Sequence, residues 1–139
     1  MTAHARDPFL PPKSVLEKLG VKPGLRVGIL GGFDEAFRRD VTRTLGVKPF
    51  ARAAKGCDLV FVRLERPGDE ARLARFITAI EPDGALWAVY AKGRRELSEN
   101  TVRAAALATG LVDIKVVAFS EALSALKLVI PRALRGARR

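Results

Sequence analysis

The sequence predicts an α/β domain in three layers, with a sheet that is mostly parallel and ends in an antiparallel hairpin. The segment LRVGILGGFDE (25–35) is an apolar strand that runs into two glycines and then into a helix beginning with acidic residues. Nucleotide-binding α/β domains begin in this way. Two further apolar segments, 58–62 and 85–90, have the length and composition of buried strands. Residues 111–130 contain two strands joined too closely for a parallel crossover, which predicts the hairpin.

The first twenty residues predict an arm and a short helix. Residues 1–12 contain three prolines and no hydrophobic periodicity, so we expect an arm that lies on the surface or is disordered. Ser14 and Glu17 have the spacing of a capping box, in which the hydroxyl and the carboxylate bond to backbone amides of the first turn. This spacing predicts a helix over residues 15–19 that ends at Gly20.

The first strand and the helix after it form the first β-α unit. A turn at Pro23 and Gly24 leads into the strand, whose continuous apolar run predicts burial on both faces. Between Asp34 and Gly46, apolar residues recur at every fourth position, at Phe37, Val41 and Leu45. This spacing predicts an amphipathic helix that packs on the strand and ends at Gly46.

The second unit follows a less regular segment. Residues 47–54 contain scattered apolar side chains and Pro49, and we interpret them as a short edge strand because proline is tolerated at an edge. After the strand 58–62, Pro67 and Gly68 precede two acidic residues that predict a helix start. This helix has an apolar stripe at Leu73, Phe76, Ile77 and Ile80. Residues 81–84 are expected to end it and to turn the chain into the strand 85–90.

The remaining residues predict one more helix and the hairpin. Ser98 is a suitable N-cap, and the helix ends at Gly110 after small apolar residues that can pack closely on a sheet, Val102, Ala105 and Ala106. Residues 111–119 alternate between apolar and polar side chains, and a second strand covers 123–130. We therefore expect a single domain over residues 13–131, between the arm at 1–12 and a basic tail at 132–139.

The chain is strongly basic, with 25 Lys and Arg against 15 Asp and Glu and a formal net charge of +10. Much of the excess lies in residues 38–55 and 127–139. Such a balance raises nucleic acid as a partner. One Tyr, one Trp and scattered Phe residues do not form a stacking platform for single strands. A solvated basic surface is the alternative interpretation.

Few residues are suited to catalysis or to metal binding. The single cysteine, Cys57, precedes an apolar strand, which predicts a buried structural thiol. The single histidine, His4, lies in the expected arm, so nucleophilic catalysis has no evident base and a zinc site lacks ligands. The acidic pairs at 34–35 and 69–70 open helices, where negative charge is stabilised. No apolar run predicts a signal peptide or a membrane span, and we expect a cytoplasmic protein with no membrane partner.

The order of elements resembles the class I S-adenosylmethionine-dependent methyltransferase fold, a Rossmann-like three-layer fold, in a shortened form. The resemblance covers residues 14–130 and is carried by LEKLGVKPGLRVGIL, CDLVFV, EPDGALWAVYAKG and the hairpin. The segments PDGALWAVYAKG and LSENTVRAAALATGLVDIKVVAFSEALSALKLV are also similar to a bacterial family of small proteins of unknown function. That family is of this fold, and the resemblance to it implies no established activity.

Several residues that the methyltransferase pattern implies for cofactor binding are replaced. The acid at the end of the first strand and the further glycines correspond here to Ile29, Phe33 and Glu35. Gly31 and Gly32 remain as the candidate cofactor contacts. The region of the second acid, which would accept ribose hydroxyls, contains Arg52 and Lys55 instead, and no proline-aromatic motif follows CDLVFV. These departures predict that no cofactor is bound, with S-adenosylmethionine held through backbone contacts as the alternative.

One basic group lies where ligands bind in open parallel sheets, beyond the carboxyl ends of the strands. It consists of five candidate anion-binding residues, Arg63, Arg66, Lys92, Arg94 and Arg95. They could face a phosphate or another anionic small molecule. Asp34 and Glu35 at the neighbouring helix start would repel such an anion.

Three functional hypotheses follow from the sequence. We prefer a non-catalytic binding or regulatory module with a methyltransferase-like fold. The second hypothesis is an S-adenosylmethionine-dependent methyltransferase with a divergent cofactor loop. The third is an accessory protein that binds nucleic acid through the basic segment 38–55 and the basic tail.

Overall fold

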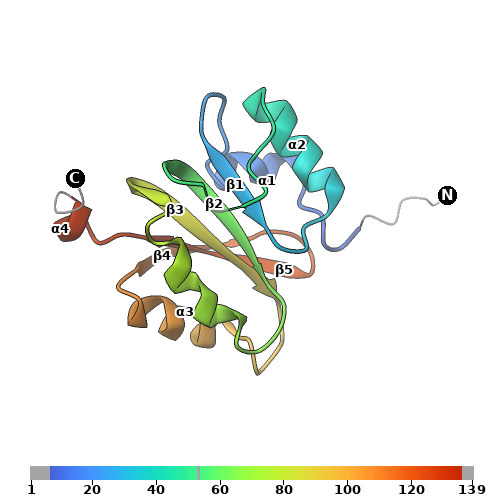
Figure 1. Ribbon diagram of the computed structural model, residues 1–139. Coiled ribbons are helices and arrows are strands. Elements are labelled where there is room, and N and C mark those ends of the chain that lie inside the picture. Colours follow the sequence, from blue (N-terminus) through green and yellow to red (C-terminus); the bar gives the residue numbers. More distant parts are fainter. Residues whose placement is uncertain (1–6, 53, 136–139) are drawn as a thin grey trace.

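The computed structural model describes residues 7–52 and 54–135, which form an α/β domain around one sheet (Figure 1). The sheet has five strands in the order β1-β2-β3-β5-β4. The first three strands are parallel to one another, and β5 is antiparallel to both β3 and β4. The strand bounds are β1 Val27–Leu30, β2 Cys57–Leu64, β3 Ile80–Ala91, β4 Val112–Ala118 and β5 Leu123–Val129. The mostly parallel sheet with a final antiparallel hairpin is therefore confirmed.

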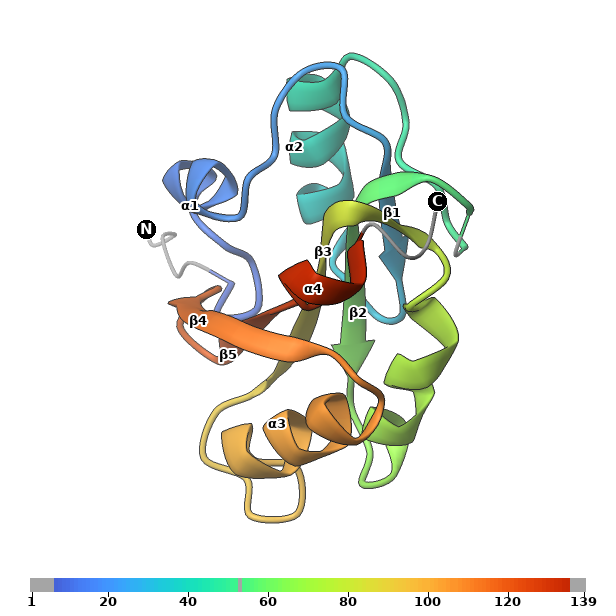
Figure 2. The same cartoon turned by 90° about the vertical axis from the view of Figure 1, so that its left-hand side faces the viewer.

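Helices cover both faces of the sheet and make it the middle of three layers. Figure 2 shows α1 (Lys13–Lys18) and α2 (Glu35–Leu45) at the top and α3 (Glu99–Ala108) at the bottom, with the sheet between them. A 3-10 helix, η1 (Asp69–Phe76), packs beside α3, and a short helix, α4 (Arg132–Arg135), follows β5. Because the sheet is twisted, the strands of the β4-β5 hairpin run at a large angle to β2 (Figure 2).

The alternation of side chains along the strands divides the core into two clusters. One cluster lies under α1 and α2 and contains Phe61, Trp87 and Phe119. The other lies under η1 and α3 and contains Leu73 and Val102. The indole of Trp87 is fully buried and donates a hydrogen bond of 3.0 Å to the carbonyl of Leu19, so it fastens the end of α1 to the sheet.

The predicted helix caps of α2 and α3 are confirmed. The Asp34 carboxylate accepts a hydrogen bond of 2.8 Å from the amide of Ala36, and α2 ends at Gly46, whose φ is +86°. The Ser98 hydroxyl accepts one of 3.2 Å from the amide of Thr101 at the start of α3. These contacts join residues close in sequence, which is why the sequence predicts them.

The predicted capping box at Ser14 is wrong. Helix α1 begins at Lys13 with Pro12 at the N-cap, which makes no side-chain cap bond, and Ser14 lies inside the helix. Pro12 has a φ of −60° and an extended ψ, so the ring sets the direction of the chain before the first turn. The backbone of the proline pair therefore places the helix start ahead of the predicted one.

Residues 47–54 do not form the predicted edge strand, although they lie at the predicted edge. The segment makes one isolated bridge beside β1, where Phe50 donates to the Val27 carbonyl and accepts from the Ile29 amide, both at 2.8 Å. Phe50 directs both its amide and its carbonyl to β1, and the Ile29 carbonyl, which would accept the next bond of a parallel ladder, accepts from the Arg38 guanidinium instead. Residue 53 lies outside the described residues.

The predicted helix after Gly68 is a 3-10 helix, and β3 begins earlier than expected. Ile80 is the first residue of β3 rather than the last member of a helical stripe, and residues 81–84 lie within the strand. A register shift between Cys57 and Leu59 accommodates them. A Cβ on Gly84 would lie 2.8 Å from the Asp58 carbonyl oxygen, so the glycine lets two strands approach closely.

The described part of the arm is tied to the hairpin. The Pro8 carbonyl accepts hydrogen bonds from the Ser120 hydroxyl at 2.7 Å and from the Ala122 amide at 2.9 Å. Leu10 is half-buried and packs against the core. Residues 1–6 of the expected arm and residues 136–139 of the expected tail lie outside the described residues. Within the described ranges, no helix has the length and apolar character needed to cross a bilayer.

Tyr90 is buried under α3, and we expect its phenol to titrate abnormally. Burial, together with the nearby Glu99 carboxylate, raises the pKa of Tyr90 to about 12. The folded state therefore binds the phenolic proton more tightly than the unfolded state, whose phenol has a pKa of about 10. This contribution to the free energy of unfolding is complete below pH 10 and is lost between about pH 10 and 12, in total about 3 kcal/mol.

Because Tyr90 is the single tyrosine, the phenolate absorbance in the near ultraviolet reports this group alone. The folded protein should show a midpoint close to pH 12, and the protein unfolded in guanidinium one close to pH 10. Coincident midpoints in the two states would contradict the prediction.

Candidate functional site

A hollow lies beyond the carboxyl ends of β1 and β2, the position at which open parallel sheets bind ligands. It has a volume of about 310 Å³. We call it the strand-end hollow, and it is lined by Phe9, Gly32, Phe33, Asp34, Arg63, Glu65 and Leu123. One of the two candidate cofactor glycines, Gly32, thus lines a hollow, and Gly31 directly precedes it.

Side chains from the end of β2 lie close to both glycines. Gly31 has a φ of +100°, and a Cβ at this position would lie 2.9 Å from the Cβ of Arg63. A Cβ on Gly32 would lie 3.2 Å from the carboxylate oxygens of Glu65. The end of β2 therefore packs onto the glycine turn, and the positive φ and close neighbour of Gly31 explain the glycine at that position without reference to a ligand.

The backbone acceptors at the end of β1 already have donors. The Arg38 guanidinium donates to the carbonyls of Ile29 at 3.2 Å and Gly31 at 3.0 Å. The Gly31 carbonyl also accepts from the Phe33 amide at 2.9 Å. Ile29 itself is fully buried in the core. A ligand that relied on these carbonyls would have to compete with Arg38.

Phe33 extends the aromatic core toward the strand-end hollow. Its ring centroid lies 5.2 Å from that of Phe37, 5.9 Å from that of Phe119 and 6.5 Å from that of Phe61. These separations are typical of packed aromatic pairs. The position that the methyltransferase pattern gives to a glycine is therefore part of a hydrophobic cluster.

The start of α2 is satisfied by its own acidic residue. The hydrogen bond from the Ala36 amide lowers the pKa of the Asp34 carboxyl below its ordinary value, and the Arg39 charge contributes to the same shift. The Asp34 carboxylate thus occupies the place at which a helix start could hold a phosphate. Glu35 is exposed and lies 4.0 Å from the Arg38 guanidinium.

The structure brings together two of the five candidate anion-binding residues. The half-buried Arg63 donates to the Leu64 carbonyl at 2.6 Å, and burial lowers the pKa of its guanidinium. Arg94 lies close enough for its charge to act on Arg63, and it donates to the Glu65 carbonyl. Both cations therefore hold the backbone at the end of β2, with Glu65 and Asp69 near Arg63 and Glu96 3.9 Å from Arg94.

The other three candidates lie apart or in solvent. Lys92 lines a separate hollow between the arm and the hairpin, with Leu10 and Ser120 among its neighbours. Arg66 and Arg95 are exposed. The sequence correctly predicts that all five lie at or after the ends of β2 and β3. It does not indicate the directions that the loops and their side chains take.

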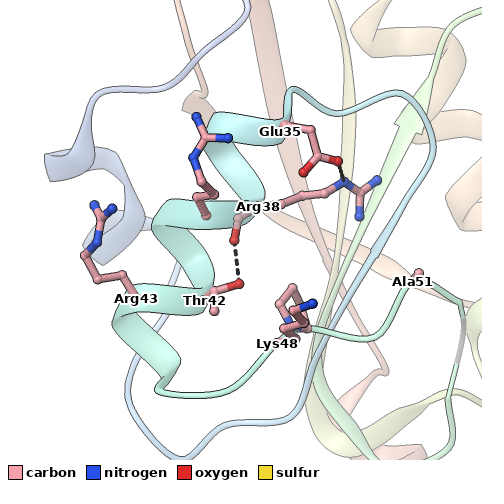
Figure 3. Close-up of a pocket in the computed structure, with 8 residues that line it drawn as sticks. Glu35, Arg38, Thr42, Arg43, Lys48 and Ala51 are labelled. Atoms are coloured by element: carbon pink, nitrogen blue, oxygen red, sulfur yellow. Dashed lines mark hydrogen bonds and ion pairs between the residues drawn. The ribbon is translucent and has the colours of Figure 1, made fainter.

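A larger hollow lies on the outer side of α2, and the sequence indicates its charge but not its shape. It measures about 710 Å³. We call it the basic hollow, and it is lined by Glu35, Arg38, Arg39, Thr42, Arg43, Lys48, Pro49 and Ala51 (Figure 3). The basic segment 38–55 marks these cations in the sequence. The hollow exists because the chain after α2 runs back beside the helix to pair with β1.

A metal centre is not evident in the part of the chain that the structure describes. Residues 7–52 and 54–135 contain no group of three or more His, Cys, Asp or Glu side chains arranged to hold an ion. Cys57 is fully buried, donates to the Ala54 carbonyl at 3.2 Å, and has a pKa that burial raises. This agrees with the predicted structural thiol.

Comparisons with known proteins identify the fold. No protein-family model and no curated protein sequence matches the chain. Similar solved structures include a SAM-dependent methyltransferase from Aquifex aeolicus, with a TM-score of 0.58, 16% identity, and coverage of 88% of this chain and 91% of that chain. Magnesium protoporphyrin IX methyltransferase ChlM from Synechocystis PCC 6803, with bound SAH, has a TM-score of 0.60 and 13% identity and covers 85% and 79%.

The mitomycin 7-O-methyltransferase MmcR is also similar, with a TM-score of 0.59 and 13% identity. The match covers 77% of this chain and 49% of MmcR, so the chain spans about half the length of that enzyme. Identities at this level establish the architecture and leave the activity open. The chain has the fold of the class I S-adenosylmethionine-dependent methyltransferases, in a form with five strands.

Proposed function

We propose that this chain is a non-catalytic binding or regulatory module with a methyltransferase fold. The observation that carries the proposal is the packing of Arg63 against Gly31 and of Glu65 over Gly32. Three further features point in the same direction. Arg38 occupies the carbonyls at the end of β1, Phe33 belongs to the aromatic core, and Asp34 caps α2. Together they replace ligand contacts by contacts within the chain.

The catalytic chemistry of methyl transfer also lacks evident participants at the strand-end hollow. A methyl acceptor generally needs a base or a polar group that orients it. The ionisable groups that line this hollow are Asp34, Arg63 and Glu65. Asp34 caps a helix, Arg63 donates to the backbone, and Glu65 lies over Gly32. Each of these side chains therefore has a structural contact.

A divergent methyltransferase is the second candidate, and the strand-end hollow itself favours it. A volume of about 310 Å³ lies at the lower end of the range for small-molecule sites. Two carboxylates, Asp34 and Glu65, line it and could accept hydrogen bonds from hydroxyl and amino groups of a cofactor. Structures with this fold bind such a cofactor, as ChlM does with SAH. A measurement of cofactor binding therefore distinguishes the two candidates.

Isothermal titration calorimetry with S-adenosylmethionine and S-adenosylhomocysteine tests the proposal. We expect no saturable heat up to millimolar ligand, because the contacts above Gly31 and Gly32 are taken. The matched variant is Gly32→Phe, which fills the strand-end hollow without touching the basic hollow. Saturable binding to the wild-type chain that disappears in Gly32→Phe would overturn the proposal and support the divergent methyltransferase.

A further inference from the structure

The basic hollow has more positive than negative side chains in its lining. Four cations and one carboxylate line it, and they come from α2 and from the segment after it. Figure 3 shows Glu35, Arg38, Thr42 and Arg43 on successive turns of α2, with Lys48 on the segment that runs beside the helix. The two walls are thus built from different parts of the chain and both bear cations.

The two ends of the hollow differ in how firmly their cations are held. Arg38 is held by the carbonyls of Ile29 and Gly31, so its guanidinium has a fixed position at one end. Arg43 lies 3.4 Å from the Asp40 carboxylate, but its side chain is 67% exposed. Exposed pairs of this kind are weak and exchange readily with other partners.

Arg39 and Lys48 are the cations most available to a ligand. Both residues are exposed, and they line the hollow from α2 and from the neighbouring segment respectively. Arg39 and Arg43 are four residues apart, which places them one turn and about 6 Å apart along the helix axis. The hollow therefore has guanidinium-bearing residues on α2 and an ammonium-bearing residue on the segment beside the helix.

The remaining lining indicates what kind of anion fits. Pro49, Ala51 and the Thr42 side chain supply small neutral surfaces, and none of the described residues that line the hollow is aromatic. The nearby Phe50 ring is covered by the Arg26 guanidinium, 4.8 Å from its centroid. Nucleobases therefore have nothing to stack on here. Several guanidinium groups on one surface suit a ligand with repeated phosphates, which they can bind through paired hydrogen bonds.

We propose that the basic hollow binds the phosphate backbone of double-stranded nucleic acid without reading its base sequence. The chain's net charge of +10 favours a polyanion over a small phosphate, because the field of the whole molecule acts on an extended ligand. This inference concerns a different surface from the strand-end hollow. It stands or falls independently of cofactor binding.

The experiment measures the fluorescence anisotropy of a labelled 20-base-pair duplex, about two helical turns, over a range of salt concentrations. The test variant is Arg39→Ala with Lys48→Ala in the full chain. The matched control is Arg72→Ala with Arg75→Ala, which removes the same charge from exposed residues of η1 on the other face of the sheet. The fluorescence of Trp87 confirms that each variant is folded.

We expect the wild-type chain to bind the duplex at low salt and to lose affinity steeply as salt rises. The test variant should bind at least about tenfold more weakly, and its salt slope should fall by about 2, because two phosphate contacts are removed. The control should keep the wild-type slope. Equal losses in both variants, or no duplex binding at low salt, would refute the proposal.

A competition arm separates nucleic acid from other phosphates. Unlabelled duplex should displace the labelled duplex at a far lower phosphate concentration than ATP or inorganic phosphate does. Equal displacement at equal phosphate concentration would show that the hollow binds small phosphate anions instead, and would overturn the proposal. Tighter binding of a single strand than of the duplex would also contradict it.

Discussion

Replacing Phe37 with alanine is expected to lower the free energy of unfolding by about 3–5 kcal/mol. Phe37 is 1% exposed, and it lies between α2 and the sheet. Its ring centroid is 5.2 Å from that of Phe33, 5.6 Å from that of Phe61 and 5.1 Å from that of Phe119. The truncation leaves a cavity in a cluster whose other rings come from three separate segments of the chain, so the cavity cannot easily collapse.

Urea unfolding followed by Trp87 fluorescence measures this change, because Trp87 is the single tryptophan and is fully buried. Phe9→Ala is the matched control, since the Phe9 side chain is 50% exposed and its loss should change stability by less than about 1 kcal/mol. If Phe37→Ala costs no more than the control, the aromatic cluster does not hold α2 on the sheet.

Replacing Gly31 with alanine is expected to destabilise the chain by about 2–5 kcal/mol. Two costs add at this position. The φ of +100° is unfavourable for any residue with a Cβ, at about 1–2 kcal/mol. The new Cβ would also lie 2.9 Å from the Cβ of Arg63 and 3.3 Å from its carbonyl oxygen, and such overpacking adds about 1–3 kcal/mol.

Comparison with Gly68→Ala separates the cost of overpacking from the cost of the backbone conformation. Gly68 has the same φ of +100°, but nothing lies within 4 Å of the position of its Cβ. The control should therefore lose only the backbone share, and the difference between the two variants measures the approach of β2 to the glycine turn. If both variants lose the same free energy of unfolding in chemical denaturation, Arg63 can move aside at no energetic cost. That result would remove the main argument that close packing requires Gly31.

Local signals in the sequence predict most of the elements correctly. The start and end of α2 follow from Asp34 and Gly46, and the start of α3 follows from Ser98, because a cap is formed by residues a few positions apart. The antiparallel hairpin follows from the short distance between two apolar segments. Each of these inferences depends only on contacts between neighbours in the chain.

The predictions that fail depend on contacts with distant residues. Ile80 continues the helical stripe in the sequence, yet it begins β3 because Cys57 on β2 pairs with it. Residues 47–54 have the composition of an edge strand, yet those that the structure describes make a single bridge with β1, beside which Arg38 takes up the Ile29 carbonyl. Hydrophobic spacing cannot reveal which strand a residue will meet.

The candidate site shows the same division. Strand order and the carboxyl ends of the strands place Gly31, Arg63 and Arg94 in one region, and this much follows from the β-α pattern. The loops decide that Arg63 donates to Leu64 and Arg94 to Glu65, while Lys92 lines a separate hollow between the arm and the hairpin. Side-chain directions in loops depend on packing between segments that are far apart in the sequence, as in the contact of Arg94 with Glu65, 29 positions away.

From its residues alone this protein is an α/β chain of methyltransferase-like order with a degenerate glycine turn and a basic helix. Those properties follow from hydrophobic periodicity, glycine and proline positions, and charge, which act over short stretches of sequence. The contacts of Arg63 and Glu65 with the glycine turn and the existence of the basic hollow follow from the folded chain. The first depends on the pairing of β1 with β2, which sets Glu65 beside Gly32, and the second on the bridge between Phe50 and β1, which brings Lys48 back beside α2. Both pairings join segments that are not neighbours in the sequence.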